Sequence, residues 1–424
     1  MAVQEIGEAG GVMRAADGRP LKASLARALR RQKLRALMLI APLLIFVLVT
    51  FLSPIADMLF RSVQNDIVPD TLPRTVAALQ EWDPASAEAP GEPVFAALYE
   101  DMKIAVAERV HTRVGSRLNY EQSGMASLFR KSGRGVRGMD EALPFRAQFT
   151  EIDEDWLDPE VWRTIDAFSG RTTSGYYLAA VDLELTADGI AQKPDGERIY
   201  LFLFQRTLIM SLAITLACLL LGYPVAYLLA TVPTRRANLL LILVLLPFWT
   251  SLLVRTSAWK VLLQTEGVIN DILVAINLVA DDGRLALINN QTGTIIAMTH
   301  ILLPFMILPL YSVMKTIPPA YVRAAKSLGA TNWTAFWRVY FPQSVPGIGA
   351  GSILVFILAI GYYITPELVG GTSGTFISNR IAFHISSSLN WGLAAALASI
   401  LLGAVLVLYW TYDRIVGIDN VKLG

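Results

Sequence analysis

Long apolar segments constrain this chain more than any other feature of its sequence. Residues 36–60 are apolar except for Asp57 near the far end. At about 1.5 Å per helical residue, such a segment crosses a hydrocarbon core of about 30 Å. Five more segments of this kind follow, at residues 202–230, 237–262, 294–314, 347–369 and 391–412. The chain is therefore expected to be an all-α polytopic membrane protein with six transmembrane helices.

The composition fits a membrane protein and excludes an ordinary soluble one. Of 424 residues, 54% are hydrophobic and 17% are charged, and the mean hydropathy is +0.48. A cleaved signal peptide is the alternative for residues 36–60. It is disfavoured because the basic region before the segment is long, the apolar run exceeds a typical signal core, and no small-residue cleavage site follows.

Side chains that could bind a metal or form a disulfide are sparse. Cys218 is the single cysteine and lies in an apolar segment, so no disulfide within the chain can form and a packing role is expected. His111, His300 and His384 are far apart and have no metal-ligand spacing. We expect no metal and no cofactor.

The distribution of basic residues predicts the topology. The first 33 residues carry seven Lys/Arg against three Asp/Glu, and six spans place both termini on one side. Basic residues then gather on that side, which the positive-inside rule makes cytoplasmic. They are Arg235, Arg236, Lys315, Arg323, Lys326, Arg338, Arg414 and Lys422. The predicted parts are a cytoplasmic tail (1–35), the first span (36–60), a periplasmic insertion (61–199), a membrane core (200–413) with a cytoplasmic loop (317–346), and a cytoplasmic tail (414–424).

The polar insertion at residues 61–199 is long enough to be a domain. It holds 15 Lys/Arg and 24 Asp/Glu, a net charge of −9. Residues 95–117 show helical spacing, and Asp158 with Pro159 and Glu160 predicts the start of another helix. Strands fit residues 176–185. The basic, glycine-rich residues 130–137 could bind an anion or nucleic acid, but a solvated loop is favoured.

The loop before the fifth apolar segment has the pattern of a docking site. Residues 315–346 contain no acidic residue. Pro318 and Pro319 suit a helix start, Ala324, Ala325 and Leu328 can share one face, and Gly329 permits a sharp turn. A second short helix is expected through Trp333, Phe336 and Trp337, and Pro342 and Pro346 are expected to stop it before the next span. Small residues flanked by aromatics suit a ball-and-socket contact. The alternative is a basic cytoplasmic loop whose aromatics rest at the membrane interface.

The spacing within this loop resembles that of a known family. The loop reads Ala324-Ala325-xxx-Gly329, then nine residues, then Val339-x-Phe341-Pro342. This pattern is similar to the EAA loop of ATP-binding-cassette (ABC) importer permeases. In that family the pattern is Glu-Ala-Ala-xxx-Gly, nine residues, then Ile-x-Leu-Pro. The usual glutamate is Arg323 here. The resemblance extends over all six spans, leaves out the insertion, and is closest to spermidine/putrescine-type permeases. Further similar stretches lie at residues 221–227, 246–250, 364–371 and 390–392.

The resemblance implies half of a type I importer in the bacterial inner membrane. Its expected partners are a second permease subunit, a dimer of ATPase subunits, a periplasmic substrate-binding protein and membrane lipid, with no nucleic acid. The chain itself contains no GxxxxGK[ST] motif and is not expected to be an enzyme. The residues expected to couple to the ATPase are Arg323, Ala324, Ala325, Leu328, Gly329, Ala330, Trp333 and Pro342.

The solute implied by the resemblance is a polyamine. Opines, amino-acid derivatives and organic anions stay open. A membrane sensor is disfavoured because no cytoplasmic signalling domain follows, and a secondary transporter because it needs no docking loop and should show paired interrupted helices.

Ionisable groups within spans are costly and are candidates for the substrate path. Glu367 follows Pro366 and precedes Gly370 and Gly371, so local unwinding is expected to expose its carboxylate. The candidate path residues are Trp249, Arg255, Tyr362, Tyr363 and Glu367, a carboxylate with aromatic faces for an ammonium group. The alternative is that the aromatics pack between helices while Glu367 pairs with Arg255 or caps a helix.

Overall fold

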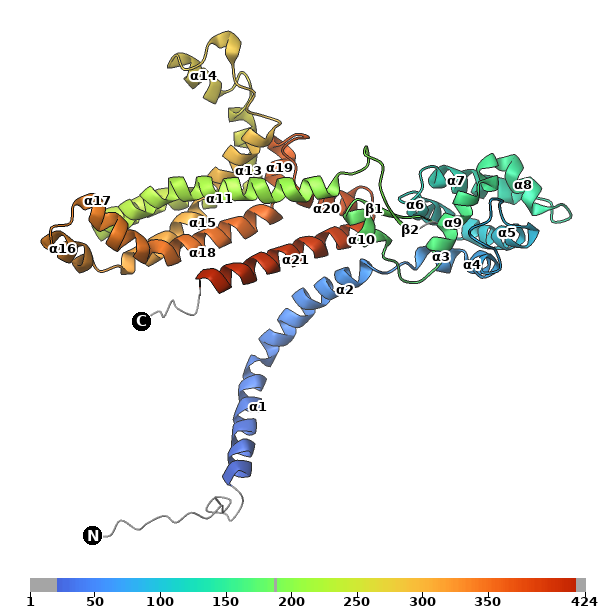
Figure 1. Cartoon of the computed structure of the whole chain (residues 1–424), viewed down its shortest axis with the longest axis horizontal. Helices are drawn as coiled ribbons and strands as arrows, with labels where there is room; N and C mark the ends of the chain where they lie inside the picture. The colour runs from blue at the N-terminus through green and yellow to red at the C-terminus, as the bar shows by residue number, and fades with distance from the viewer. Residues whose placement is uncertain (1–20, 187–188, 417–424) are drawn as a thin grey trace. The chain divides into compact units, whose positions relative to one another are not determined.

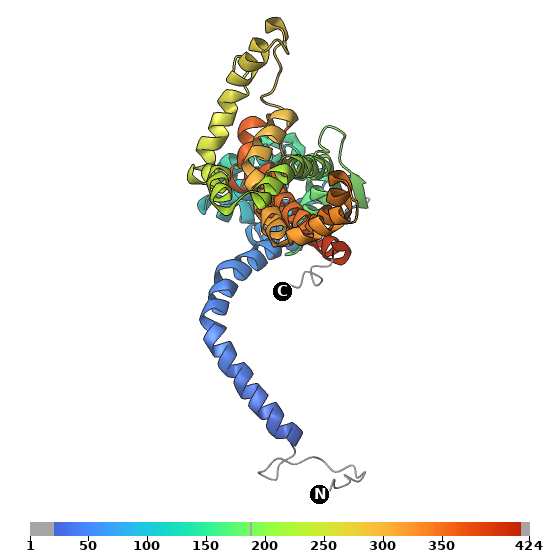
Figure 2. The ribbon, with the colours of Figure 1, turned by 90° about the vertical axis from the view of Figure 1, so that its left-hand side faces the viewer.

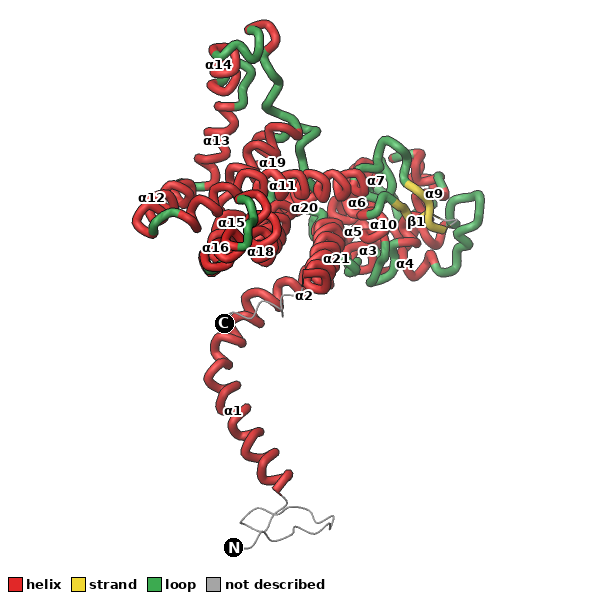
Figure 3. The backbone as a smooth tube through the Cα atoms, turned by 60° about the vertical axis from the view of Figure 1, so that its left-hand side comes forward, coloured by secondary structure: helices red, strands yellow, loops and turns green. Residues whose placement is uncertain are grey.

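The computed structural model describes residues 21–186 and 189–416, and it divides after Phe60 into two compact units. Residues 1–20 of the cytoplasmic tail expected at residues 1–35 lie outside the described residues. Residues 417–424 of the expected C-terminal tail also lie outside them. Figure 3 shows that the described chain consists of helices joined by loops, with one two-stranded ribbon.

The first unit is a long helical segment. It comprises α1 (Leu21–Val47), a π-helical turn η1 (Leu48–Leu52) and α2 (Ser53–Arg61) except for Arg61, which already belongs to the second unit. The part from Gln32 to Arg61 is long and apolar enough to span a membrane. Its apolar side chains are exposed all round within this unit, as expected for a helix that faces lipid.

The insertion domain (residues 61–199) forms the N-terminal part of the second unit. Its elements are α3 (Ile67–Thr71), α4 (Pro73–Leu79), α5 (Glu92–Ala107), α6 (His111–Leu118), α7 (Met125–Gly135), η2 (Val136–Gly138), α8 (Phe145–Ile152), η3 (Glu154–Leu157), α9 (Pro159–Ala167), α10 (Gly175–Ala180), β1 (Leu183–Thr186) and β2 (Gly189–Gln192). The strands pair antiparallel, from Leu183 with Gln192 to Thr186 with Gly189.

The insertion domain has a core of its own, built around buried aromatic rings. Phe95 lies edge-on to Trp162, with ring centroids 4.8 Å apart. Trp156 and Trp162 are fully buried, yet both indole N–H groups are satisfied. Trp156 donates to Ser132 Oγ and Trp162 donates to the Trp156 carbonyl, each at 2.9 Å. Because buried indoles keep their hydrogen bonds, these rings fix the packing of α5, α7 and α9.

Some local predictions for this domain are confirmed and others are wrong. Asp158 caps α9, accepting a hydrogen bond from the Glu160 N–H at 2.9 Å, as predicted. The single helix expected at 95–117 is two helices, because Arg109 takes a positive φ of 62° between α5 and α6. Residues 176–180 are helical, so only the end of the predicted strand region forms a strand.

The prediction of a loop at residues 130–137 is also wrong, because these residues are helical. Its glycines serve close packing. A Cβ at Gly133 would come within 2.4 Å of the His111 ring, and one at Gly135 within 2.3 Å of Ile152 Cδ1. Helix interiors disfavour glycine unless packing requires it, and here packing does.

A short neck joins the insertion domain to the rest of the unit. The incoming chain pairs with the outgoing chain: Asn65 N–H donates to the Arg171 carbonyl at 2.9 Å, and Thr173 N–H donates to the Val63 carbonyl at 2.8 Å. The Asn65 side chain also donates to the carbonyls of Phe168 and Gly170. Beyond the neck, α10 packs on the membrane core in one buried cluster with Tyr200, Leu203, Ile377 and Leu397.

The membrane core follows the insertion domain. Its elements are α11 (Tyr200–Thr231), α12 (Thr234–Leu245), η4 (Leu246–Trp249), α13 (Leu252–Leu262), α14 (Val268–Ala275), η5 (Asp281–Gly283), α15 (Gln291–Thr316), α16 (Pro319–Ser327), α17 (Asn332–Ala335), η6 (Phe336–Tyr340), α18 (Phe341–Gly361), α19 (Ile364–Val369), α20 (Ile377–Ser386) and α21 (Trp391–Val416).

Helices α11, α15 and α18 run side by side and form the centre of the core (Figure 1). Small residues let their backbones approach, as is usual between membrane helices. Gly351 on α18 lies where a Cβ would come within 2.7 Å of Met306 Sδ on α15. Cys218 is buried in the same cluster as Met298 and Met306, in the packing role predicted for it.

Among the described residues, five helices are long and apolar enough to span a membrane. The segment predicted as one span at 237–262 is a pair, Thr234–Trp249 and Leu252–Leu262, bent by 93°, and the number becomes six if this pair counts as one span. The bend falls where Pro247 opens a 3₁₀ turn and Ser251 caps a new helix by accepting from the Val254 N–H. From this bend, α13 leads to α14, which stands away from the central helices (Figures 1 and 2).

The fifth predicted span, 347–369, has different limits. A continuous helical segment runs from Asn332 to Gly361, and residues 364–369 form the separate α19. Pro342 and Pro346, expected to stop the preceding helix, lie inside this segment. The π turn η6 directly before Pro342 explains its tolerance, because the wider hydrogen-bond ring makes room where the proline lacks an N–H.

Candidate functional site

The predicted docking loop forms a helix and a tight turn. Helix α16 carries Arg323, Ala324 and Ala325 and ends at its C-cap Leu328. Gly329 has φ +89°, its N–H donates to the Lys326 carbonyl, and the Ala330 N–H donates to the Ala325 carbonyl, each at 3.0 Å. This pair of bonds is a Schellman motif, which favours glycine at the left-handed position. The sharp turn predicted at Gly329 is confirmed.

A second helix starts two residues after this turn. The Thr331 side chain caps it, accepting from the Thr334 N–H at 3.2 Å. Trp333 lies in α17, and the same helical segment continues through η6 into α18, where Pro342 lies. The loop is therefore attached rigidly to a candidate membrane span.

Apolar side chains of this loop are exposed to a degree that internal packing does not explain. Leu328 is 90% exposed and Trp333 is 72% exposed, and Tyr321 and Trp337 are also exposed. Ala324 next to them is exposed, while Ala325 is half-buried. Isolated apolar residues on a surface are ordinary, but a group of large ones on one short loop marks an interaction site.

The opposite side of the loop is anchored by aromatic rings. Phe336 was predicted to lie in the second short helix, whereas no role was predicted for Tyr223, Tyr227 and Tyr340. Phe336 and Tyr340 pack edge-on against Tyr227, and Phe336 also against Tyr223, with ring centroids 5.1–6.2 Å apart. The Tyr223 hydroxyl lies 3.0 Å from Ser344 Oγ. Tyr223 and Tyr227 are four residues apart on α11, and that spacing was the available signal.

The candidate substrate-path residues gather at the break between α18 and α19, with one exception. Tyr362 and Tyr363 form the break itself, and their carbonyls accept hydrogen bonds from Ser378 Oγ at 2.6 Å and Asn379 Nδ2 at 2.9 Å. The unwinding thus precedes Pro366, which lies inside α19, and both carbonyls are occupied. Trp249 lies in η4, largely exposed, and within the described residues no hydrogen bond or ring contact joins it to the others.

Glu367 and Arg255 are not paired with each other. Asn379 Nδ2 donates to Glu367 Oε2 at 2.7 Å, and Glu367 is exposed. Arg255 on α13 has two buried nitrogens, Nε and Nη1, without a partner among the described residues. The packing of α13 on α19 is tied by the buried hydroxyls of Thr256 and Thr365, 3.1 Å apart. The alternative in which Glu367 pairs with Arg255 is therefore wrong, and Asn379 is a partner that the sequence did not reveal.

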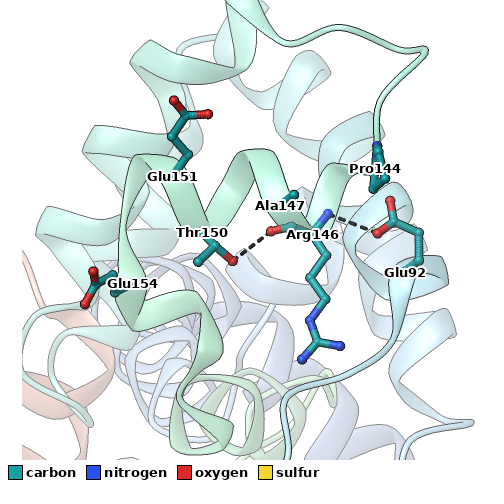
Figure 4. Close-up of a pocket in the computed structure, with 7 residues that line it drawn as sticks. All are labelled: Glu92, Pro144, Arg146, Ala147, Thr150, Glu151 and Glu154. Atoms are coloured by element: carbon teal, nitrogen blue, oxygen red, sulfur yellow. Dashed lines mark hydrogen bonds between the residues drawn. The ribbon is translucent and has the colours of Figure 1, made fainter.

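Clusters of acidic or metal-binding side chains are the other kind of candidate site. Over the described residues, no group of three or more His, Cys, Asp or Glu side chains is placed to hold a metal ion. A shallow hollow on the insertion domain contains Glu92, Glu151 and Glu154 (Figure 4), but their carboxylates do not converge. Glu92 instead accepts hydrogen bonds from the Phe145 and Arg146 N–H groups and so holds the start of α8.

The geometry shows a helical protein with five helices that could span a membrane, or six if the bent pair counts as one, and an exposed loop joined rigidly to one of them. Residues 219–416 match the family model described as binding-protein-dependent transport system inner membrane component. The chain belongs to this family, the permease subunits of ABC importers. Both the family and the permease fold predicted for the membrane core are therefore confirmed.

Two similar permease proteins agree with that membership, and one solved structure shows a distant likeness only. The spermidine/putrescine transport system permease protein PotB of Salmonella typhimurium (strain SL1344) is 34% identical over 238 residues, 55% of this chain and 82% of the relative. The inner membrane ABC transporter permease protein YdcU of Escherichia coli (strain K12) is 32% identical over 258 residues, 57% of this chain and 82% of the relative. A chain of the bacterial alginate ABC transporter in complex with alginate pentasaccharide-bound periplasmic protein has a TM-score of 0.41 and 20% identity, covering 53% of this chain and 80% of that one.

Proposed function

We propose that this permease imports a polyamine such as spermidine or putrescine. Support comes from a relative named for those solutes and from the exposed carboxylate of Glu367 beside Tyr363. A carboxylate offers charge to an ammonium group, and aromatic faces add cation–π attraction. Asn379 holds the carboxylate in one place, so the group is positioned before the solute arrives.

The proposed coupling site is the loop from α16 to α17, inserted in a cleft of a separate ATPase subunit. The observation that carries this proposal is the exposure of Leu328 and Trp333 beside the small Ala324. These two large side chains fill the cleft of the ATPase subunit, while the small side chain of Ala324 lets the surface of the cleft approach the backbone of α16. Arg323, Ala325, Gly329, Ala330 and Pro342 complete the site.

ATP hydrolysis belongs to that partner in this proposal, and this chain converts its closure into helix movement. Because α17, η6 and α18 are one continuous helical segment, a push at Trp333 is transmitted to the membrane core. Rocking of packed helices then gives alternating access.

The proposed topology has six spans, with the bent pair counted as one. Helix α11 starts beside the insertion domain at Tyr200 and ends at the docking loop, where Tyr227 packs on Phe336. Its 32 residues extend about 48 Å at about 1.5 Å per residue, more than the hydrocarbon core. The docking loop and both termini are then cytoplasmic, and the insertion domain is periplasmic, in a bacterial inner membrane.

Two more partners complete the proposal. The insertion domain supplies area for a periplasmic substrate-binding protein, because a standard interface needs about 800 Å² per partner. A second permease subunit covers apolar side chains that stand exposed on α12 to α14, such as Leu243, Val254 and Ile272.

A second candidate solute class is favoured by one observation. Two buried nitrogens of Arg255 lack partners among the described residues, and Arg255 lies on α13, which packs on α19 through Thr256 and Thr365. An uncompensated guanidinium attracts a carboxylate and repels an ammonium group. An amino-acid derivative, an opine or an organic anion would use Arg255 in place of Glu367.

Co-purification and uptake together test the proposal. The chain, expressed with the ATPase and binding protein of the same operon, should co-purify with the ATPase and take up labelled putrescine in proteoliposomes when ATP is supplied. Failure of the ATPase to bind would refute the importer mechanism. A bound ATPase with uptake of an anionic solute and none of putrescine would refute the polyamine alone.

A further inference from the structure

A cavity of about 590 Å³ lies where the insertion domain meets the loop between α20 and α21. Gln64 of the neck, Arg113 and Arg117 of α6, and Asn390 of the loop all line it. Its volume is in the range of small-molecule sites. Neither the docking loop nor the substrate-path residues take part in it.

Two polar side chains in the cavity wall are buried with donors that lack acceptors. Arg117 is 3% exposed; its Nη1 donates to Glu121 Oε1 at 2.8 Å, but Nε and Nη2 have no partner among the described residues. Asn390 is 4% exposed, and its Nδ2 likewise has none among them. Buried donors in folded proteins are nearly always satisfied, so an acceptor is expected in this cavity.

Arg117 is held in place by the rings on either side. Its guanidinium carbon lies 4.7 Å from the centroid of the Phe168 ring and 4.5 Å from that of Tyr176. A guanidinium fixed in this way presents a planar fork of N–H groups, the geometry that suits phosphate and carboxylate oxygens. The Tyr120 hydroxyl donates to the Ser388 carbonyl at 2.6 Å, which ties the turn that follows α6 to the loop that carries Asn390.

The charge of the cavity differs from that of the domain around it. The insertion domain has a net charge of −9, yet three arginines, Arg61, Arg113 and Arg117, line the cavity. Against them stand one lining carboxylate, Asp66, and the Glu121 carboxylate paired with Arg117, which leaves a local charge of +1. The Asp66 carboxylate also accepts a hydrogen bond from Gln64 Nε2. A local excess of positive charge within an acidic domain favours an anionic ligand.

Residues at the ends of candidate spans line the cavity. Arg61 is the last residue of one candidate span and Trp391 is the first residue of another, and both line the cavity. Tryptophan and basic residues at span ends mark the depth of lipid headgroups. We propose that this cavity binds a phosphate group through Arg117, Arg113 and Asn390, supplied by an anionic lipid headgroup or by free phosphate.

The test uses the full-length chain, purified in detergent, with two binding assays. Inorganic phosphate is titrated while thermal unfolding is followed. Lipid retention is measured by native mass spectrometry after incubation with vesicles of phosphatidylglycerol or of phosphatidylcholine. The variants are Arg113→Gln, an exposed side chain, and Asn390→Asp, which puts a carboxylate where a donor was. Arg134→Gln, exposed on the same domain but outside the cavity, is the matched control.

Wild type and Arg134→Gln should bind one anion per chain, and each cavity variant should bind it at least about tenfold more weakly. Arg113→Gln loses one charge-assisted hydrogen bond, and Asn390→Asp loses a donor and adds a charge that repels the anion. Retained phosphatidylglycerol that free phosphate displaces identifies a lipid as the source. Phosphate binding without lipid retention identifies free phosphate as the source. Equal binding by wild type and both cavity variants, or binding of neither ligand, overturns the proposal, the latter leaving a cavity that holds only water.

Discussion

The ring of Tyr176 on α10 lies against the backbone of Gly392 on α21, so close that a Cβ at position 392 would come within 2.3 Å of its Cε2 and Cζ atoms. The neighbouring Tyr177 hydroxyl accepts hydrogen bonds from Ser62 Oγ and Ser399 Oγ, each at 2.9 Å. The end of the insertion domain is therefore packed tightly against the last membrane helix. A displacement of α21 would therefore shift α10 and the insertion domain to which α10 belongs.

Gly392→Ala should loosen this contact. Overpacking of a tight site costs about 1–3 kcal/mol, so the thermal unfolding temperature in detergent should fall. Gly403→Ala is the control, because it lies on the same helix with nothing within 4 Å of its added Cβ. Equal unfolding temperatures for the two variants would contradict the tight contact.

Asp101→Ala should destabilise the insertion domain. The buried carboxylate accepts from the Thr75 N–H at 2.7 Å, from Thr75 Oγ1 at 2.9 Å and from Arg74 Nη1 at 3.1 Å. Its loss leaves a buried N–H without an acceptor, at a cost of about 1–3 kcal/mol. Hydrogen–deuterium exchange of α4 and α5 in the full chain should become faster. Glu100→Ala removes an exposed carboxylate from α5 itself and should leave that exchange unchanged; comparable acceleration in both variants would count against a special role for Asp101.

Shortening the insertion domain at its neck should lower the affinity of this chain for the periplasmic substrate-binding protein. Replacing residues 67–166 by a glycine–serine linker keeps the pairing of Asn65 with Arg171 and the packing of α10 on the core. A deletion from Asp66 to Asp195 would remove α10 as well. Surface plasmon resonance should report at least about tenfold weaker binding, since most of the proposed contact area is lost. Unchanged affinity would show that the insertion domain is only a structural cap.

Gly329→Asp should abolish transport and stimulation of the ATPase while membrane insertion stays normal. The left-handed φ of +89° is tolerated best by glycine and next by asparagine or aspartate. Gly329→Asn is therefore the matched control, with nearly the same shape and no charge. Activity in the Asn variant together with inactivity in the Asp variant would assign the effect to charge at the docking surface. Full activity in both would remove the docking argument.

Glu367→Gln should lower putrescine uptake about tenfold or more if the solute is a cation. Glutamine keeps an oxygen for the hydrogen bond from Asn379 Nδ2, so the change removes charge and little structure. Arg255→Gln is the opposite test and should not lower putrescine uptake, since it removes a repulsive charge. The reverse pattern, with Arg255→Gln alone impairing uptake, would assign the path to an anionic or zwitterionic solute.

The sequence by itself determined the features that depend on neighbours along the chain. The apolar segments predicted a multispanning helical protein because their length matches a bilayer. The cap at Asp158 and the turn at Gly329 followed from local backbone chemistry. The spacing from Ala324 to Pro342 was enough to indicate the family.

Only the tertiary structure decided the features that depend on residues far apart. Pro342 inside a helix, the helical residues 130–137 and the bend before α13 each contradict a local pattern. Close packing of Gly133 and Gly135 on His111 and Ile152 accounts for the second of these. Asn379, the partner of Glu367 and Tyr363, lies on α20. Arg113 and Arg117 line the same cavity as Asn390, although most of the membrane core separates them in sequence. Such contacts leave no periodic signal, because folding alone brings their residues together.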